Sequence, residues 1–128
     1  MNIIYIEDDA TNRAVLREML ATAGLPLTEA EDARTGLRLI DTGAYDLVVM
    51  DLRMPEISGL TAIRQLRARE DGSRRIPILV VSAELSPGVR DMCRSAGADA
   101  FVEKPITMER LFGAIGSTLV NGEGAVLN

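Results

Sequence analysis

The sequence carries three acids, a hydroxyl and an ammonium group, each placed just after a short apolar run: Glu7-Asp8, Asp51, Ser82 and Lys104. Three carboxylates gathered in one place repel one another, which raises their pKa values unless a cation joins them. Carboxylate oxygens suit Mg²⁺, whereas zinc or copper would want histidine or cysteine. The set therefore indicates a magnesium site with one hydroxyl and one ammonium group beside it, suited to placing a phosphoryl group on Asp51.

Each of these residues also has an ordinary structural alternative. An acid after a strand can cap a helix, Ser82 can close a turn, and the ammonium of Lys104 can be a simple surface charge. Lys104 is, however, the only lysine of the chain. The joint placement of the five residues, more than any one of them, favours a functional site.

The elements that must position these residues follow from hydrophobic periodicity. Short β-branched runs predict strands at residues 3–6, 27–30, 47–50, 76–81 and 99–103, and helical spacing predicts helices between them and after the last. Five alternating units predict an α/β fold, a flavodoxin-like doubly wound (βα)5 three-layer sandwich whose parallel sheet has the order 2-1-3-4-5. Because ligands bind at the carboxyl ends of such strands, this order brings the five polar residues to one crevice.

Composition limits the remaining possibilities. A chain of 128 residues with 47% apolar content fits one domain, predicted at residues 1–120, with 121–128 as a flexible tail or the start of a linker. A net charge of −5 argues against direct contact with nucleic acid. The absence of histidine excludes imidazole chemistry, and the single Cys93 excludes an internal disulfide. With no leader and no long apolar run, we expect a cytoplasmic protein without membrane contact.

These motifs resemble those of one family, the response-regulator receiver domains of two-component (phosphorelay) signalling, of the chemotaxis-regulator type. The similarity covers about residues 2–120. It rests on the acidic pair Glu7-Asp8, the phosphoacceptor Asp51, the segment Met54-Pro55-Glu56-Ile57-Ser58-Gly59, the switch residues Ser82 and Phe101, and Lys104-Pro105. Three departures are small, namely Glu for the first Asp of the pair, Ser for the commoner Thr, and Phe for the frequent Tyr.

The resemblance implies a phosphoacceptor regulator that assists its own phosphoryl transfer and dephosphorylation, and not an enzyme acting on other substrates. It implies an Mg²⁺ cofactor, with Mn²⁺ as a substitute, bound directly by Asp8, Asp51 and the main-chain carbonyl of Arg53, with Glu7 orienting bound water. Lys104 then binds the phosphoryl group.

The family also implies a switch and two kinds of partner. Ser82 closes on the phosphoryl group and Phe101 turns inward, which changes a surface read by an unknown downstream effector. A histidine kinase or histidine phosphotransfer protein supplies the phosphoryl group, and we expect it to dock at Thr11, Val15 and Pro105. The Lys104-Pro105 bond is expected to be cis.

Three rival functions fit the sequence less well. A phosphatase of the haloacid dehalogenase type wants a second Asp where this chain has Arg53. A flavodoxin-like cofactor carrier needs a phosphate-cradling loop, and the run Glu7-Asp8-Asp9 would repel a phosphate there. A receiver used only for docking would usually have lost an acid or the lysine. The sequence leaves open whether the domain acts alone or belongs to a larger chain.

Overall fold

The core of the molecule is a five-stranded parallel sheet. The structure is a computed structural model that describes residues 1–127, with side chains described for residues 1–120. The strands are β1 (Ile3–Ile6), β2 (Leu27–Ala30), β3 (Leu47–Asp51), β4 (Ile78–Ser82) and β5 (Ala100–Glu103), hydrogen-bonded in the order β2-β1-β3-β4-β5. The predicted fold class and strand order are confirmed.

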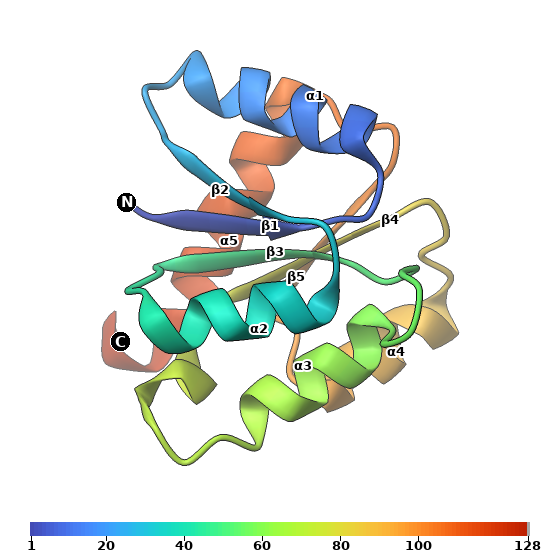
Figure 1. The fold of residues 1–128 in the computed structure, drawn as a ribbon. Coiled ribbons are helices and arrows are strands. Elements are labelled where there is room, and N and C mark those ends of the chain that lie inside the picture. Colours follow the sequence, from blue (N-terminus) through green and yellow to red (C-terminus); the bar gives the residue numbers. More distant parts are fainter. Residues whose placement is uncertain (128) are drawn as a thin grey trace.

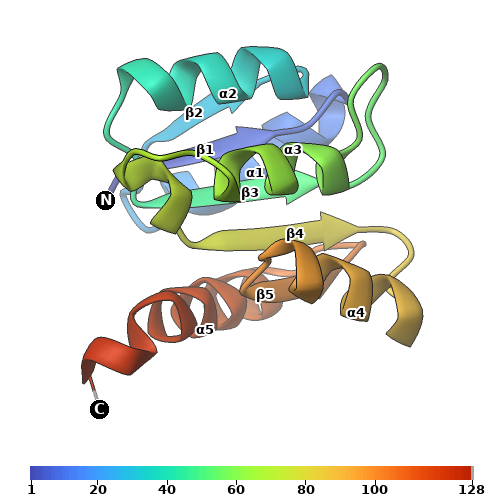
Figure 2. The same cartoon turned by 90° about the horizontal axis from the view of Figure 1, so that it is seen from below.

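Helices cover both faces of this sheet, as Figures 1 and 2 show. Alternate strand residues point to opposite faces, so each strand supplies side chains to two separate apolar clusters. One cluster packs under α2 (Ala33–Thr42), α3 (Gly59–Arg67) and α4 (Pro87–Ala96). The other packs under α1 (Ala10–Ala21) and α5 (Met108–Leu127). A 3₁₀ turn, η1 (Gly72–Arg75), precedes β4.

Short polar side chains set the start of each of the helices nearest the predicted crevice. Asp9 caps α1 by accepting hydrogen bonds from the backbone N–H groups of Thr11 (2.7 Å) and Asn12 (3.2 Å). Ser86 caps α4, and Pro87 occupies its first turn, where a missing N–H is tolerated. Because the Asp9 side chain is taken up by the cap, it is a helix-start residue and not part of the acid pair, which also agrees with the sequence.

Several observed element ends differ from the predicted ones, most of them by one or two residues. β4 begins at Ile78 and not at Ile76, because Ile76 closes the 3₁₀ turn and Pro77 has no N–H to donate. α1 ends at Ala21, and the exposed Ala23 lies beyond it. α5 continues to Leu127, past the predicted start of a tail at residue 121; Asn128 lies outside the described residues, and the domain boundary stays a prediction.

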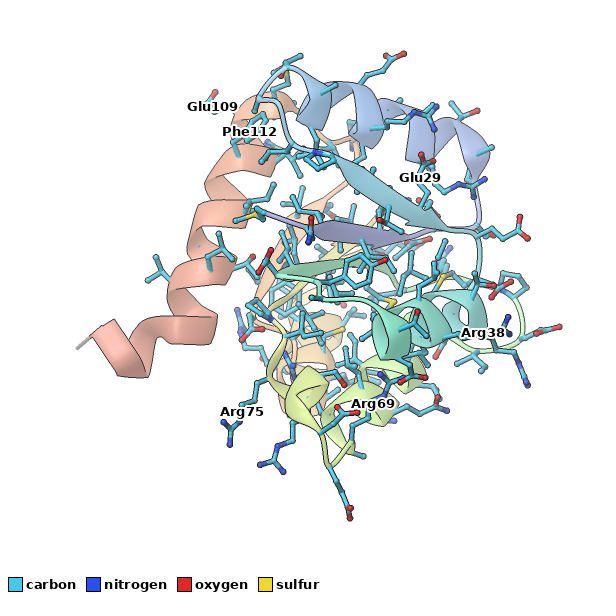
Figure 3. All side chains as sticks on the ribbon, turned by 60° about the vertical axis from the view of Figure 1, so that its left-hand side comes forward. Glu29, Arg38, Arg69, Arg75, Glu109 and Phe112 are labelled. Carbon is cyan, nitrogen blue, oxygen red and sulfur yellow. The ribbon has the colours of Figure 1, made fainter. Side chains whose placement is uncertain are left out.

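Charged side chains lie on the outside of the helical layers. Figure 3 shows Arg38 and Arg75 projecting from the body of the molecule, and both residues are exposed. Within the described part of the chain, no helix is long and apolar enough to cross a membrane.

Candidate functional site

Strand register brings the predicted acids together at the carboxyl end of the sheet. In the pairing of β1 with β3, Ile6 lies beside Met50. The residues that follow these two, Glu7 and Asp51, therefore lie side by side at the carboxyl end of the sheet. On the other side of β1, the Glu7 N–H donates to the carbonyl of Ala30 in β2 at 3.0 Å, which fixes the backbone of Glu7. Neighbouring parallel strands therefore fix two carboxylates side by side before any side-chain contact is considered.

The same edge receives Ser82 and Lys104 from the other side. Asp51 is paired with Val81, which places Ser82 one residue beyond it on β4. The Lys104 N–H donates to the Ser82 carbonyl at 2.9 Å, so the backbone ties these two residues together. The bond from Lys104 to Pro105 is cis, as predicted.

The loop after Asp51 is packed tightly against the strand that precedes it. A Cβ at Gly59 would lie 2.2 Å from the Asp51 carbonyl oxygen and 2.8 Å from the Leu52 Cα, so only glycine fits. The Gly59 N–H also donates to the Leu52 carbonyl at 2.9 Å. Glu56 takes a positive φ of 65°, which lets the loop double back. The first turn of α3 therefore holds the end of β3 in place.

The three acids form one compact cluster. Glu7, Asp8 and Asp51 each offer a carboxylate oxygen, and these oxygens lie within 4.8 Å of one another. Glu7 and Asp51 are buried, at 1% and 5% exposure, whereas Asp8 is exposed. The Lys104 ammonium lies 2.6 Å from Glu7 Oε1 and 3.7 Å from Asp51 Oδ1. In this state the lysine is thus bound mainly to Glu7, and it faces Asp51 without a hydrogen bond.

The two buried carboxyl groups, Glu7 and Asp51, have pKa values that are shifted in opposite directions. Burial, followed by the neighbouring Glu7, raises the pKa of Asp51 to about 7. Burial also opposes ionisation of Glu7, but hydrogen bonding with Asp51 and Lys104 outweighs it and lowers the pKa of Glu7 to about 2. Partial desolvation and the Glu7 carboxylate raise the pKa of Asp8. Of the two buried carboxyl groups, Asp51 is therefore the one that ionises at the higher pH.

The cluster fits a hard divalent cation. Its donors are all carboxylate oxygens, the kind that Mg²⁺ prefers. Glu7 Oε2 is buried and has no hydrogen-bond donor among the described residues. A buried, unsatisfied carboxylate oxygen is costly, so a cation that it could coordinate would remove a penalty that the folded chain otherwise carries.

Comparison with known proteins identifies the family. The model of the response regulator receiver domain matches residues 3–116, which is most of the chain. The chain belongs to this family. The receiver domain is 31% identical over 121 residues to the polar-differentiation response regulator DivK of Brucella ovis, covering 92% of this chain and 95% of that protein.

Longer proteins contain similar receiver domains. The chain is 33% identical over 122 residues to the sensory/regulatory protein RpfC of Xanthomonas campestris pv. campestris, and 38% identical over 111 residues to the response regulator MprA of Mycolicibacterium vanbaalenii. These matches cover 94% and 87% of this chain, but it spans only 17% of RpfC and 47% of MprA.

Solved structures agree with the fold. The receiver domain of sensor histidine kinase PA1611 from Pseudomonas aeruginosa PAO1, a crystal structure with a magnesium ion coordinated in the active site cleft, is 30% identical with a TM-score of 0.83, covering 92% of this chain and 96% of that one. Vibrio cholerae CheY4, at 24% identity and a TM-score of 0.86, covers 92% and 98% and shows the same fold.

The two predicted switch residues of the receiver domain lie in different surroundings. Ser82 is buried, and its hydroxyl accepts a hydrogen bond from the Glu84 N–H at 3.3 Å. Phe101 on β5 is half-buried, and the guanidinium carbons of Arg90 and Arg94 lie 5.5 and 5.0 Å from its ring centroid. Such distances allow cation–π attraction, so α4 rests on the Phe101 ring through two arginines.

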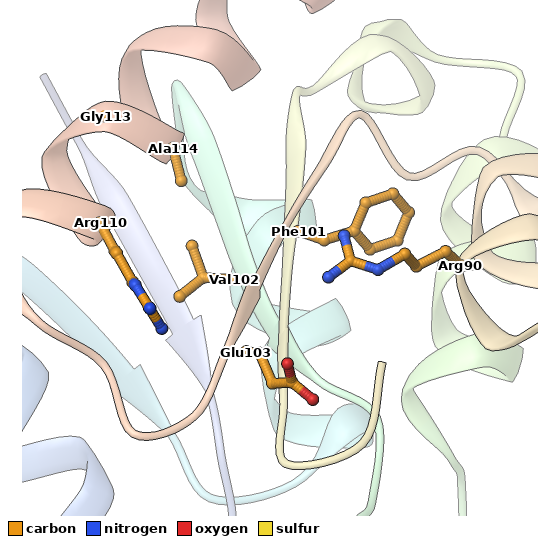
Figure 4. Close-up of a pocket in the computed structure, with 7 residues that line it drawn as sticks. All are labelled: Arg90, Phe101, Val102, Glu103, Arg110, Gly113 and Ala114. Carbon is orange, nitrogen blue, oxygen red and sulfur yellow. The ribbon is translucent and has the colours of Figure 1, made fainter. Parts of the chain in front are cut away.

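A hollow of about 380 Å³ lies beside Phe101, between α4, β5 and α5. Figure 4 shows Arg90 next to the Phe101 ring, with Arg110 on the other side of β5. The predicted switch aromatic therefore borders a surface feature of the receiver domain and not only its core.

The residues predicted to dock a donor are only partly brought together. Val15 and Pro105 line a hollow of about 180 Å³, next to Lys104. Val15 is 41% exposed, so its apolar side chain is accessible from solvent. Thr11 is exposed in the first turn of α1 and is not among the residues that line this hollow.

Two residues at the site were missed by sequence reasoning. The Tyr5 hydroxyl donates to Glu7 Oε1 at 3.1 Å, and Arg13 donates to the Glu7 carbonyl at 2.7 Å. Tyr5 stands out as the only aromatic residue in a strand of isoleucines, and this was the available signal. Nothing in the sequence pattern distinguishes Arg13 from the other arginines of the helices.

Proposed function

We propose that this receiver domain is a phosphoacceptor switch that takes a phosphoryl group on Asp51 from the phosphohistidine of a histidine kinase or histidine phosphotransfer protein. The observation that supports this most directly is the placement of Asp51 at the end of β3, within 4.8 Å of two other acids and 3.7 Å from Lys104. A carboxylate beside an ammonium group and a cation site suits attack on phosphorus.

In this proposal Asp8, Asp51 and the main-chain carbonyl of Arg53 hold Mg²⁺, with Mn²⁺ as a substitute, and Glu7 supports the ion. When bound, the ion supplies positive charge that neutralises the equatorial phosphoryl oxygens. The PA1611 receiver domain, which has a magnesium ion in its cleft, supports this by similarity. Asp51 would be in its charged carboxylate form with a cation bound beside it, since an adjacent positive charge favours ionisation.

The residues of the chain then have defined parts in transfer. An Asp51 carboxylate oxygen bonds to phosphorus as the phosphorus–nitrogen bond of the donor breaks and its electron pair stays on the imidazole. Lys104 moves from Glu7, 2.6 Å away, to a phosphoryl oxygen. The Ser82 hydroxyl leaves the Glu84 N–H and donates to another phosphoryl oxygen.

The output follows from the position of Phe101. As Ser82 moves toward the phosphoryl group it vacates space at the end of β4, and Phe101 turns inward from its place between Arg90 and Arg94. Its movement reshapes the hollow between α4, β5 and α5, the surface that we assign to a downstream effector. Donor docking is assigned to the opposite side of Lys104, at Thr11, Val15 and Pro105.

The test is phosphorylation followed by intact-mass measurement at neutral pH. With acetyl phosphate and Mg²⁺, the wild type should gain one acid-labile phosphoryl group, and chelation of the metal should abolish the gain. Asp51→Asn should take none, while Asp91→Asn, which changes an exposed acid on α4, should match the wild type. An adduct that persists in Asp51→Asn would contradict the assignment of the acceptor.

A further inference from the structure

Tyr5 is placed where a buried strand residue can reach the acid cluster. It lies in β1 with no exposed surface, two residues before Glu7, so both side chains point to the same face of the sheet. Its ring packs with the cluster under α1 and α5, and its hydroxyl donates to Glu7 Oε1 at 3.1 Å. A buried tyrosine normally finds such a partner, but here the partner is a residue of the proposed cation site.

The two carboxylate oxygens of Glu7 are in different environments. Oε1 accepts from both the Tyr5 hydroxyl and the Lys104 ammonium, at 3.1 and 2.6 Å. Oε2 is buried with no donor among the residues that the structure describes. The two donors on Oε1 therefore fix the rotation of the carboxylate, and Oε2 is the oxygen left over for a cation.

We propose that Tyr5 is a positioning residue of the cation site: its hydroxyl holds Glu7 Oε1, so that Oε2 stays available to the ion when Lys104 leaves Glu7 for a phosphoryl oxygen. This inference rests on the proposed function, in which Lys104 makes that move. It also assigns Glu7 a fixed orientation, with the phenol on one carboxylate oxygen and the other oxygen facing the ion and its bound water.

Glu7 needs a second hydrogen-bond donor because only one ammonium group, that of Lys104, faces the two buried carboxylates. Lys104 is the only lysine, and it faces two buried carboxylates at 2.6 and 3.7 Å. Once Lys104 pairs with a phosphoryl oxygen, the Glu7 carboxylate loses the one charged donor that it has among the described residues, and it would be free to rotate. The Tyr5 hydroxyl remains, because β1 is central and rigidly paired on both sides. A hydrogen bond to an ionised group is strong enough to keep the orientation.

The first experiment measures Mg²⁺ affinity by calorimetry, with the metal alone, in the wild type, Tyr5→Phe, Lys104→Met and the double variant. Tyr5→Phe keeps the ring and removes only the hydroxyl. We expect it to weaken Mg²⁺ binding roughly threefold in the wild type and about tenfold in the Lys104→Met background, because a hydrogen bond to a charged group is then the last one on Oε1. Equal Mg²⁺ affinity of Lys104→Met and the double variant would overturn the proposal.

Two controls separate positioning from packing. In a Glu7→Asp background the shorter acid withdraws from the phenol, so Tyr5→Phe should no longer change Mg²⁺ affinity. A purely structural role would instead lower the urea-unfolding free energy of Tyr5→Phe and leave its Mg²⁺ affinity unchanged, which would also overturn the proposal. Tyr45→Phe, which changes the other tyrosine, at the edge of the other apolar cluster, should match the wild type.

A spectroscopic measurement tests the contact directly. The chain has two tyrosines and no tryptophan, so Tyr45→Phe leaves Tyr5 as the only fluorophore. Its emission should change on Mg²⁺ addition along the same binding curve as the calorimetry, whereas Tyr5→Phe should show no Mg²⁺-dependent change. Tyr5 emission that does not change on Mg²⁺ addition would contradict the proposal.

These readouts do not depend on phosphorylation. If Mg²⁺ binding responds to Tyr5 as expected but Asp51 takes no phosphoryl group, the proposed function fails and Tyr5 still positions the ion. If Asp51 is phosphorylated while Tyr5→Phe changes neither affinity nor emission, only this inference fails.

Discussion

Gly59 offers a sharp test of how the fold holds the phosphoacceptor strand. The added methyl of Gly59→Ala would lie 2.2 Å from the Asp51 carbonyl oxygen, 3.0 Å from the Asp51 carbonyl carbon and 2.8 Å from the Leu52 Cα. All three are backbone atoms, which have no rotamer to move to. The first turn of α3 must therefore shift away from the end of β3.

The size of the effect follows from two opposing contributions. Forcing a methyl into a filled site costs about 1–3 kcal/mol. Replacing glycine in a helix returns at most about 1 kcal/mol, and less at the first position, where Gly59 stands. We therefore expect Gly59→Ala to lower the unfolding free energy by about 1–2 kcal/mol. Mg²⁺ affinity should fall with it, since Asp51 and the Arg53 carbonyl are displaced.

Urea unfolding with a matched control measures this. Gly116 is exposed in α5 and has no positive φ, and a methyl added there would meet nothing within 4 Å beyond its own helix backbone. Gly116→Ala should therefore raise the unfolding free energy by about 0.5–1 kcal/mol. The two substitutions should thus change the unfolding free energy in opposite directions. A Gly59→Ala protein as stable as the wild type, with unchanged Mg²⁺ affinity, would refute the reasoning.

Two further predictions concern pH and docking. In metal-free protein the raised pKa of Asp51, about 7, means that the folded state holds a proton that the unfolded state has lost, so the unfolding free energy should fall as pH rises from about 4 to 7. The lowered pKa of Glu7, about 2, acts below that window, where stability falls as pH falls through it. Urea unfolding in chelator should show this decline in the wild type and not in Asp51→Asn; parallel curves would contradict it. Val15→Asp should slow phosphoryl transfer from a phosphohistidine protein about tenfold or more, because docking would bury an unpaired charge. Labelling by acetyl phosphate should stay unchanged. Equal slowing with both donors would contradict the docking role and show that Val15 supports the structure of the site.

The fold and the acid cluster were predictable because each depends on local rules. Buried strands gave short apolar runs, helical spacing indicated the helices between them, and strand ends in a doubly wound sheet converge by topology. The register of β1 and β3 then places Glu7 beside Asp51, and this placement does not depend on any side-chain preference.

What escaped the sequence depends on side-chain direction and on tight backbone contact. The pairing of the Lys104 ammonium with Glu7, at 2.6 Å, and not with Asp51, at 3.7 Å, depends on side-chain direction, and no spacing rule predicts it. The Tyr5 contact also needs three dimensions, since a single tyrosine in an apolar strand has many possible partners. Such contacts join residues far apart in sequence or reach across a face, which periodicity alone does not resolve.

At the amino ends of β4 and β5, away from the acid cluster, the side chain of Arg67 holds one end of α4 in place. Arg67 uses all five of its N–H donors, on the carbonyls of Gly97, Arg74 and Ile76 and on the Asp99 carboxylate. Gly97 directly follows α4, so this network fixes the carboxyl end of the helix to β4 and β5.

The amino end of α4 is held differently. It follows the exposed turn after Ser82, and Arg90 ties it through a hydrogen bond from Nε to the Leu85 carbonyl at 3.0 Å. A displacement of Ser82 in the proposed switch therefore moves the end that is tied to its own turn, while Arg67 holds the other end. Arg90 and Arg94 both lie over Phe101, so in the proposed switch a tilt of α4 about its fixed end would change the environment of that ring and of the hollow beside it.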